Sequence, residues 1–124
     1  MHDPVGRNSE LAARLLDVVN ESELEDFVGG LVAEAARSSG RRIPAHAAPR
    51  LVASLTQTAE RTLPALSVAL GDEGRAPAPI VTQAAARLYG VETEGMSAED
   101  RDFEIARQFV RFAQAEARRA AGAP

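Results

Sequence analysis

The 124-residue chain contains no cysteine, no lysine and no tryptophan. Without cysteine it can form no disulfide, no cysteine-ligated zinc or iron–sulfur site and no thiol nucleophile. Without lysine it cannot form a Walker A phosphate-binding loop. All 14 basic residues are therefore arginine. We interpret this as the codon bias of a GC-rich genome; the alternative is arginine selected for bidentate pairing with carboxylates.

Long hydrophobic runs are also missing. The longest candidate, residues 63–70, contains Pro64 and Ser67, whereas a membrane-spanning helix needs about 18 or more apolar residues. Residues 1–8 lack the basic and apolar regions of a secretory signal. We therefore expect a soluble, cytoplasmic protein that binds no membrane. Export by a dedicated machine that reads no N-terminal signal is the alternative.

Residues that carry catalysis or bind metals are sparse. His2 and His46 stand far apart, and no helix contains a His-x-x-x-His or Glu-x-x-His pair. Neither G-x-S-x-G nor S-x-x-K occurs, so a serine nucleophile has no recognisable setting. The carboxylates gather at expected helix starts, where capping and the helix dipole explain them. The sequence predicts no enzyme, no cofactor and no metal site.

The formal net charge of −4 and the pI near 5.2 disfavour general binding to the nucleic-acid backbone. One basic cluster, formed by Arg37, Arg41, Arg42 and Arg50, surrounds a proline-containing connector without interleaved aromatic residues. We interpret it as a solvated helix end and expect no nucleic-acid partner. A DNA-binding regulator remains a weaker alternative.

Helical patterns extend along the chain, and no segment shows strand alternation. We predict an all-α fold, a compact bundle of four to five helices with a long amphipathic C-terminal helix. Residues 9–121 would form a single domain, between a flexible leader at 1–8 and a frayed tail at 122–124. The helices are expected at 9–19, 20–38, 49–63 with a further turn at 65–70, 80–89 and 98–121, with linkers at 40–48, 71–79 and 90–97.

The second expected helix has the clearest start. Asn20 is suited to the N-cap and Glu23 to the third position of a capping box, while Gly40 is suited to the C-terminal end. Gly29 and Gly30 lie inside this helix, where each glycine costs up to about 1 kcal/mol relative to alanine. They mark either a weak spot or kink, or the close approach of a neighbouring helix.

The C-terminal helix is apolar over an arc of about 180°, whereas a surface helix needs only about 100°. One seam comprises Phe103, Ala106, Val110, Ala113 and Ala117, and the other comprises Ile105, Phe109 and Phe112. Alanine supplies 25 of the 56 hydrophobic residues, so the core is thin and one seam is predicted to meet other copies. The alternative is that this chain's other helices fill both seams. The predicted protein–protein interface consists of Phe103, Ile105, Phe109, Val110, Phe112, Leu24, Phe27 and Leu31.

Three stretches, residues 16–31, 86–97 and 98–111, resemble a group of small bacterial helical proteins. These proteins share a start of the form N-E-x-E-L-E-x-F-L-G-x-L and an end that includes E-D-R-x-F-E-x-A-R-x-F-V-R. Leu63 and Pro64 also match a Leu-Pro step in the family's apolar middle, but Thr56 and Gln57 make this middle more polar. The resemblance implies a small accessory or self-assembling protein, in some members encoded near phage-tail-like injection machines. It supplies no catalytic residue.

Together these features predict a non-enzymatic structural protein that self-associates into a homo-oligomeric assembly through amphipathic helices. The alternative is a small adaptor or accessory protein that binds a different protein through the same surface, in one version a protein of a phage-tail-like injection machine. The two differ in whether the chain assembles without a partner.

Overall fold

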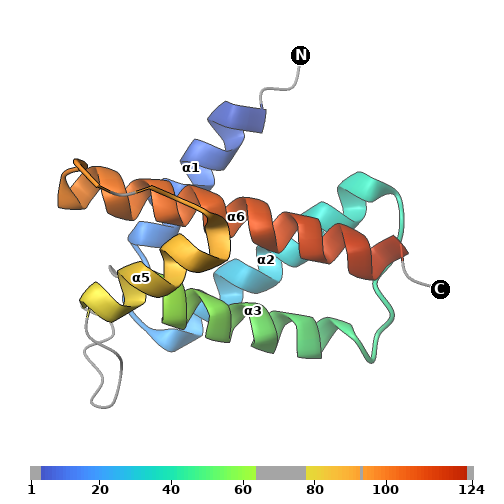
Figure 1. The fold of residues 1–124 in the computed structure, drawn as a ribbon. Helices are drawn as coiled ribbons and strands as arrows, with labels where there is room; N and C mark the ends of the chain where they lie inside the picture. Colours follow the sequence, from blue (N-terminus) through green and yellow to red (C-terminus); the bar gives the residue numbers. More distant parts are fainter. Residues whose placement is uncertain (1–3, 64–77, 93, 123–124) are drawn as a thin grey trace.

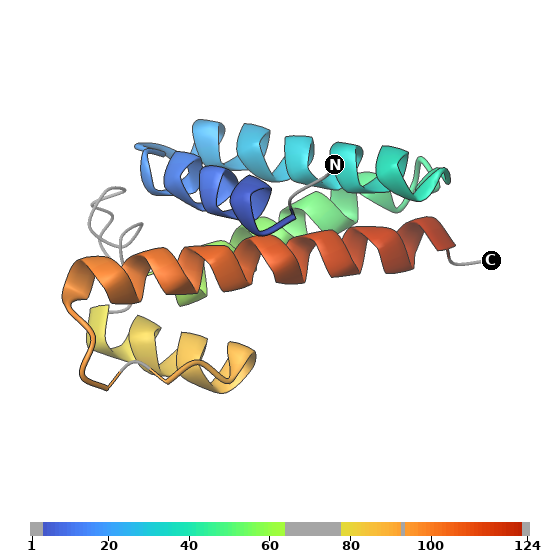
Figure 2. The ribbon, with the colours of Figure 1, turned by 90° about the horizontal axis from the view of Figure 1, so that it is seen from above.

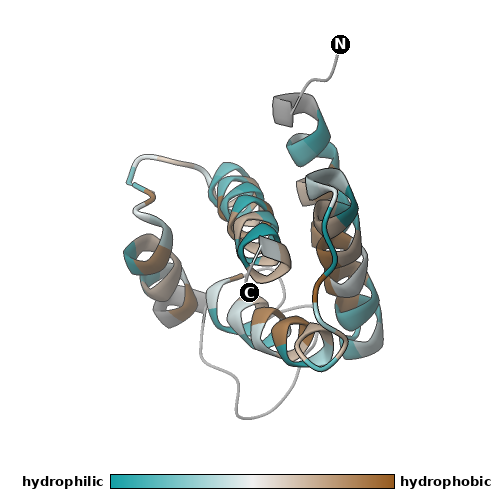
Figure 3. Cartoon of the chain, turned by 90° about the vertical axis from the view of Figure 1, so that its right-hand side faces the viewer, coloured by the Kyte–Doolittle hydropathy of each residue, from teal (hydrophilic) through white to brown (hydrophobic). Residues whose placement is uncertain are grey.

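The computed structural model describes residues 4–63, 78–92 and 94–122, and every regular element in these ranges is an α-helix (Figure 1). The helices are α1 (Pro4–Leu16), α2 (Glu21–Ser39), α3 (Ala48–Thr62), α5 (Ala78–Tyr89) and α6 (Ala98–Gly122). Each helix carries both polar and apolar residues, as amphipathic helices that bury one face do (Figure 3). The predicted all-α bundle with a long C-terminal helix is confirmed.

Helix α6 is the centre of the bundle and contacts each of the other four helices that the structure describes. Seen from above, α1 and α2 lie on one side of it and α5 lies on the other (Figure 2). Its wide apolar arc is therefore needed inside one chain, because neighbours approach it from several directions. The residues of α6 that are buried are Ile105, Ala106, Phe109, Val110, Ala113, Ala117 and Ala121.

Helix α1 begins earlier than the sequence pattern predicts. The expected flexible leader at 1–8 is wrong for residues 4–8, which are helical, whereas residues 1–3 lie outside the described residues. Two tertiary contacts hold this first part of the helix. Arg7 pairs with Glu34 of α2 at 2.8 Å, and Asn8 accepts a hydrogen bond from Gln114 of α6 at 3.2 Å. Such long-range contacts are not visible in local periodicity. The helix also ends at Leu16 and not at 19.

Helix α2 has the caps that its sequence predicts. The Asn20 side chain accepts a hydrogen bond from the Glu23 N–H at 2.8 Å. The Glu23 carboxylate accepts one from the Val19 N–H at 3.1 Å, one residue before the expected partner. At the other end Gly40 adopts a left-handed conformation (φ 74°) and its N–H donates to the Arg37 carbonyl at 3.0 Å.

No other helix that the structure describes packs closely against the two glycines inside α2. A Cβ atom added at Gly29 or Gly30 would meet nothing within 4 Å among the described residues. The interpretation of close approach within the chain is therefore wrong for this part of the structure. Helix α2 continues through both glycines and presents bare backbone on its outer side.

The remaining boundaries follow the proline and glycine signals. Pro49 lies in the first turn of α3, and Leu63 caps its end by donating its N–H to the Ala59 carbonyl at 3.0 Å. The further turn expected at 65–70 lies outside the described residues, as do 71–77 of the expected loop. Residues 78–79 of that loop are helical, and Gly122, assigned to the frayed tail, is the last residue of α6.

Candidate functional site

Most of the predicted interface lies in the interior of the chain. Leu24, Ile105, Phe109 and Val110 have no exposed surface and Leu31 is 4% exposed. A side chain enclosed by its own chain cannot contact a second copy without unfolding, so these five assignments are corrected. The other three residues, Phe27, Phe103 and Phe112, are half-buried and pack against the same core. The alternative in which the chain fills both seams of α6 therefore describes this structure.

The aromatic side chains at the edge of the core have partners within the chain. Phe112 meets Tyr89 of α5 edge-on, with ring centroids 6.0 Å apart and an interplanar angle of 67°. The Arg14 guanidinium of α1 lies 5.9 Å from the centre of the Phe27 ring. Phe112 and Phe27 thus join neighbouring helices of one chain, and each ring is partly covered by these contacts.

Tyr89 closes the contact between α5 and the rest of the bundle. Its hydroxyl lies 2.9 Å from the Thr62 hydroxyl of α3, which also donates to the Thr58 carbonyl at 2.7 Å. Burial raises the pKa of Tyr89 to about 12, although the hydrogen bond with Thr62 acts in the opposite direction. Through these contacts Tyr89 joins α5 to α3 and α6.

We expect the ionisation of Tyr89 to be measurable by ultraviolet absorbance without overlap from other residues, because the chain has one tyrosine and no tryptophan. The pKa is about 12 in the folded chain against 10.0 when unperturbed. The fold therefore favours the neutral phenol, and this preference adds to the free energy of unfolding. The added stability is complete below pH 10 and is lost as the pH rises towards 12. Ultraviolet absorbance of the tyrosinate should give a midpoint near 12. A midpoint near 10 would show that the hydroxyl is solvated.

An apolar groove opens between α2 and α3, on the side of α2 that bears Gly29. It consists of two adjoining hollows, of about 300 Å³ and 520 Å³, that share Ala48 and Val52. We call it the α2–α3 groove. Its apolar lining is formed by Gly29, Val32, Ala33, Ala36, Ile43, Ala45, Ala48, Pro49, Val52 and Ala53. Small residues dominate, so a second helix could approach its floor closely.

Opposite charges lie at the two ends of this groove. Glu25, near the start of α2, lines one hollow. Arg37, Arg41 and Arg42, at and after the end of α2, line the other. Within the described part of the chain, Glu25 and these arginines form no side-chain ion pair. The groove is thus apolar along its length and has an unpaired charge of opposite sign at each end.

The basic cluster that suggested a DNA-binding regulator is divided between this groove and the start of α3. Arg37, Arg41 and Arg42 border the groove, and Arg50 is exposed in the first turn of α3. No aromatic side chain lines the groove beside them. The groove therefore offers no ring on which bases could stack, as they do in single-stranded nucleic-acid sites. These arginines are better placed to meet carboxylates at the rim of an apolar surface.

Sequence patterns did not identify the groove, although they contain one sign of it. The search for amphipathic faces weighs large apolar residues, whereas this surface is built from glycine, alanine and proline. The Gly29–Gly30 pair was the visible sign, because interior glycines weaken a helix unless close approach compensates. Of the two, Gly29 lines the groove, and no other described residue lies within 4 Å of a Cβ atom placed there.

No protein-family model, curated protein or solved structure matches this chain. Over 4–63, 78–92 and 94–122, no three His, Asp or Glu side chains are grouped so that they could hold a metal ion. Among the helices in those ranges, none combines the length and apolar character that a membrane span requires.

Proposed function

We propose that the protein is a non-enzymatic structural protein that pairs with a second copy of itself through the α2–α3 groove. The observation that carries this proposal is an open apolar groove with unpaired charges of opposite sign at its ends. It replaces the interface on α6 and α2 that the sequence predicts, because five of the eight residues of that interface are buried within the chain.

The order of residues along α2 suits a two-fold symmetric contact. Gly29 and Ala33 lie two residues before and after Leu31, and Glu25 and Arg37 lie six residues before and after it. Two antiparallel α2 helices that cross at this level place Gly29 of one copy opposite Ala33 of its partner. The same arrangement places Glu25 opposite Arg37. Two-fold symmetry forms each of these pairs twice.

Charge complementarity favours a second copy over an unrelated partner. A single surface that presents a carboxylate at one end and guanidinium groups at the other is complementary to itself when reversed. A foreign helix would need the same charges in the same order. An adaptor that binds a different protein remains the competing function, and it differs in predicting no self-association.

Reversing the two charges tests this pairing. Glu25→Arg alone and Arg37→Glu alone should each weaken dimerisation by about tenfold or more, because each places like charges opposite one another twice. The double variant Glu25→Arg/Arg37→Glu restores both pairs and should recover dimerisation. Sedimentation equilibrium of the three variants measures this directly.

Arg61→Glu is the matched control for the change in net charge. Arg61 is exposed on α3 and does not line the groove, so this variant should dimerise like the unmodified protein. Failure of the double variant to recover, with both single variants impaired, would contradict the antiparallel arrangement. Equal behaviour of all four variants would remove the groove charges from the interface.

A further inference from the structure

A second cavity lies on the opposite side of α2, where α1, α2 and α6 meet. Its volume is about 340 Å³, within the range of about 300–1,000 Å³ that ligand pockets occupy. Leu31, Ala35 and Ala115 supply its apolar lining, and polar side chains from all three helices complete it. It shares none of its lining residues with the α2–α3 groove.

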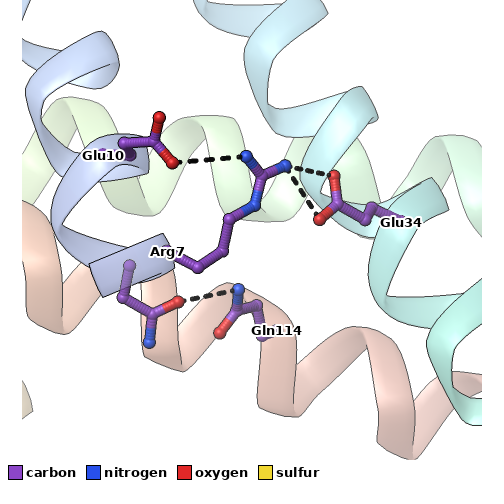
Figure 4. Close-up of polar contacts among 5 residues, drawn as sticks. Arg7, Glu10, Glu34 and Gln114 are labelled. Atoms are coloured by element: carbon purple, nitrogen blue, oxygen red, sulfur yellow. Dashed lines mark hydrogen bonds and ion pairs between the residues drawn. The ribbon is translucent and has the colours of Figure 1, made fainter. Parts of the chain in front are cut away.

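Basic side chains predominate in this cavity. Arg7, Arg111 and Arg118 line it together with a single carboxylate, that of Glu34. Figure 4 shows Arg7 reaching from α1 toward Glu34 on α2. One Arg7 nitrogen, Nη2, donates to both Glu34 oxygens, at 2.9 Å and 2.8 Å. Arg7 Nη1 also lies 3.9 Å from Glu10 Oε2, so Arg7 is shared between two carboxylates. Among the described residues that line the cavity, Arg111 and Arg118 are the two whose positive charge is offset by no ion pair.

The two remaining arginines face the cavity from one side of α6. Arg111 and Arg118 are seven residues apart, which places them on the same face and about 10 Å apart along the helix axis. Neither forms an ion pair or hydrogen bond with any residue that the structure describes. Gln114 lies between them, and its Nε2 donates to Asn8 Oδ1 at 3.2 Å. That bond joins α1 to α6 within the lining of the cavity.

From this arrangement we infer that the cavity binds a small organic phosphate monoester. Such a phosphate carries a charge of about −1.5 to −2 at pH 7, which two guanidinium groups balance. Guanidinium groups bind phosphate oxygens in bidentate fashion. The Ser38 hydroxyl, which also lines the cavity, adds a third donor. The apolar lining favours an organic phosphate over the inorganic ion, since it can cover the carbon portion of the ligand.

Isothermal titration calorimetry with phenyl phosphate and with inorganic phosphate tests this inference. Phenyl phosphate should bind more tightly than inorganic phosphate, and both should weaken as salt is added. Arg111→Gln and Arg118→Gln should each reduce the affinity for phenyl phosphate by about tenfold or more, because each removes a charge-assisted bidentate contact. Both residues are exposed, so the variants should keep the unfolding midpoint of the unmodified protein.

Arg119→Gln is the matched control, because Arg119 pairs with Glu116 at 3.3 Å and does not line the cavity. This variant should bind phenyl phosphate like the unmodified chain. Equal loss in all three variants, or no saturable binding by the unmodified protein, would overturn the inference. Duplex DNA that displaces phenyl phosphate at an equal concentration of phosphate groups would also overturn the inference. That result would show that the arginines bind the phosphodiester backbone of a nucleic acid. Dimerisation is measured separately and does not affect these outcomes.

Discussion

Replacing Phe109 with alanine is expected to lower the free energy of unfolding by about 3–5 kcal/mol. Among the residues that the structure describes, Phe109 is the largest fully enclosed side chain, and it lies on the central helix α6. Truncation removes its apolar contacts and leaves a cavity that the surrounding helices close only in part. Because a domain of this size is stable by about 5–15 kcal/mol, this loss is a large fraction of the total. Urea denaturation followed by circular dichroism measures it.

Phe103→Ala is the matched comparison on the same helix. Phe103 is half-buried at the edge of the core, so the loss of stability should be clearly smaller, below about 2 kcal/mol. The folded fraction of Phe109→Ala should still dimerise with unchanged affinity, because Phe109 does not contact the partner. A Phe109→Ala variant that keeps its stability but loses dimerisation would return the interface to α6.

Replacing Ala33 with aspartate is expected to abolish dimerisation, with a loss of affinity of about 100-fold or more. Ala33 is exposed in the single chain and lines the α2–α3 groove. In the proposed dimer each copy would bury a carboxylate opposite the partner's Gly29 backbone, which costs several kcal/mol. The same carboxylate would compete, one turn along α2, for the Arg37 that pairs with the partner's Glu25. The monomer should stay folded, since the side chain points into open space. Size-exclusion chromatography with light scattering reports the mass.

Ala13→Asp provides the control for the intrinsic cost of aspartate in a helix. Ala13 is exposed on α1 and lines none of the cavities described above. Both variants should lose similar, small amounts of stability, below about 1 kcal/mol, while only Ala33→Asp becomes monomeric. If Ala33→Asp dimerises like Ala13→Asp, the groove is not the interface.

The helices that the sequence predicted well are those whose signals are local. Asn20, Glu23 and Gly40 act on backbone groups within a few residues, so their caps on α2 could be read directly from the chain. The start of α1 depends on Arg7 reaching Glu34, 27 residues away, and on Asn8 reaching Gln114, 106 residues away. No local pattern contains those contacts, so the first turns of α1 were predicted to be a leader.

The site was predicted less well than the fold, for a geometric reason. Periodicity shows how wide the apolar face of α6 is, but it cannot show how many helices of the same chain contact that face. Four helices do, so Ile105, Phe109 and Val110 are core residues. The groove and the cavity described above are formed by α2 with α3 and by α1, α2 and α6 together, so both depend on packing between segments distant in sequence.

The absolute mass of the unmodified protein, measured by light scattering across a dilution series, tests self-association most directly. Each chain has a mass of 13.1 kDa. Pairing through the α2–α3 groove predicts a discrete mass of two chains at high concentration, which falls to that of one chain on dilution. A mass of 13.1 kDa at every concentration would contradict self-association. A continuous series of larger masses would contradict a closed two-fold pair.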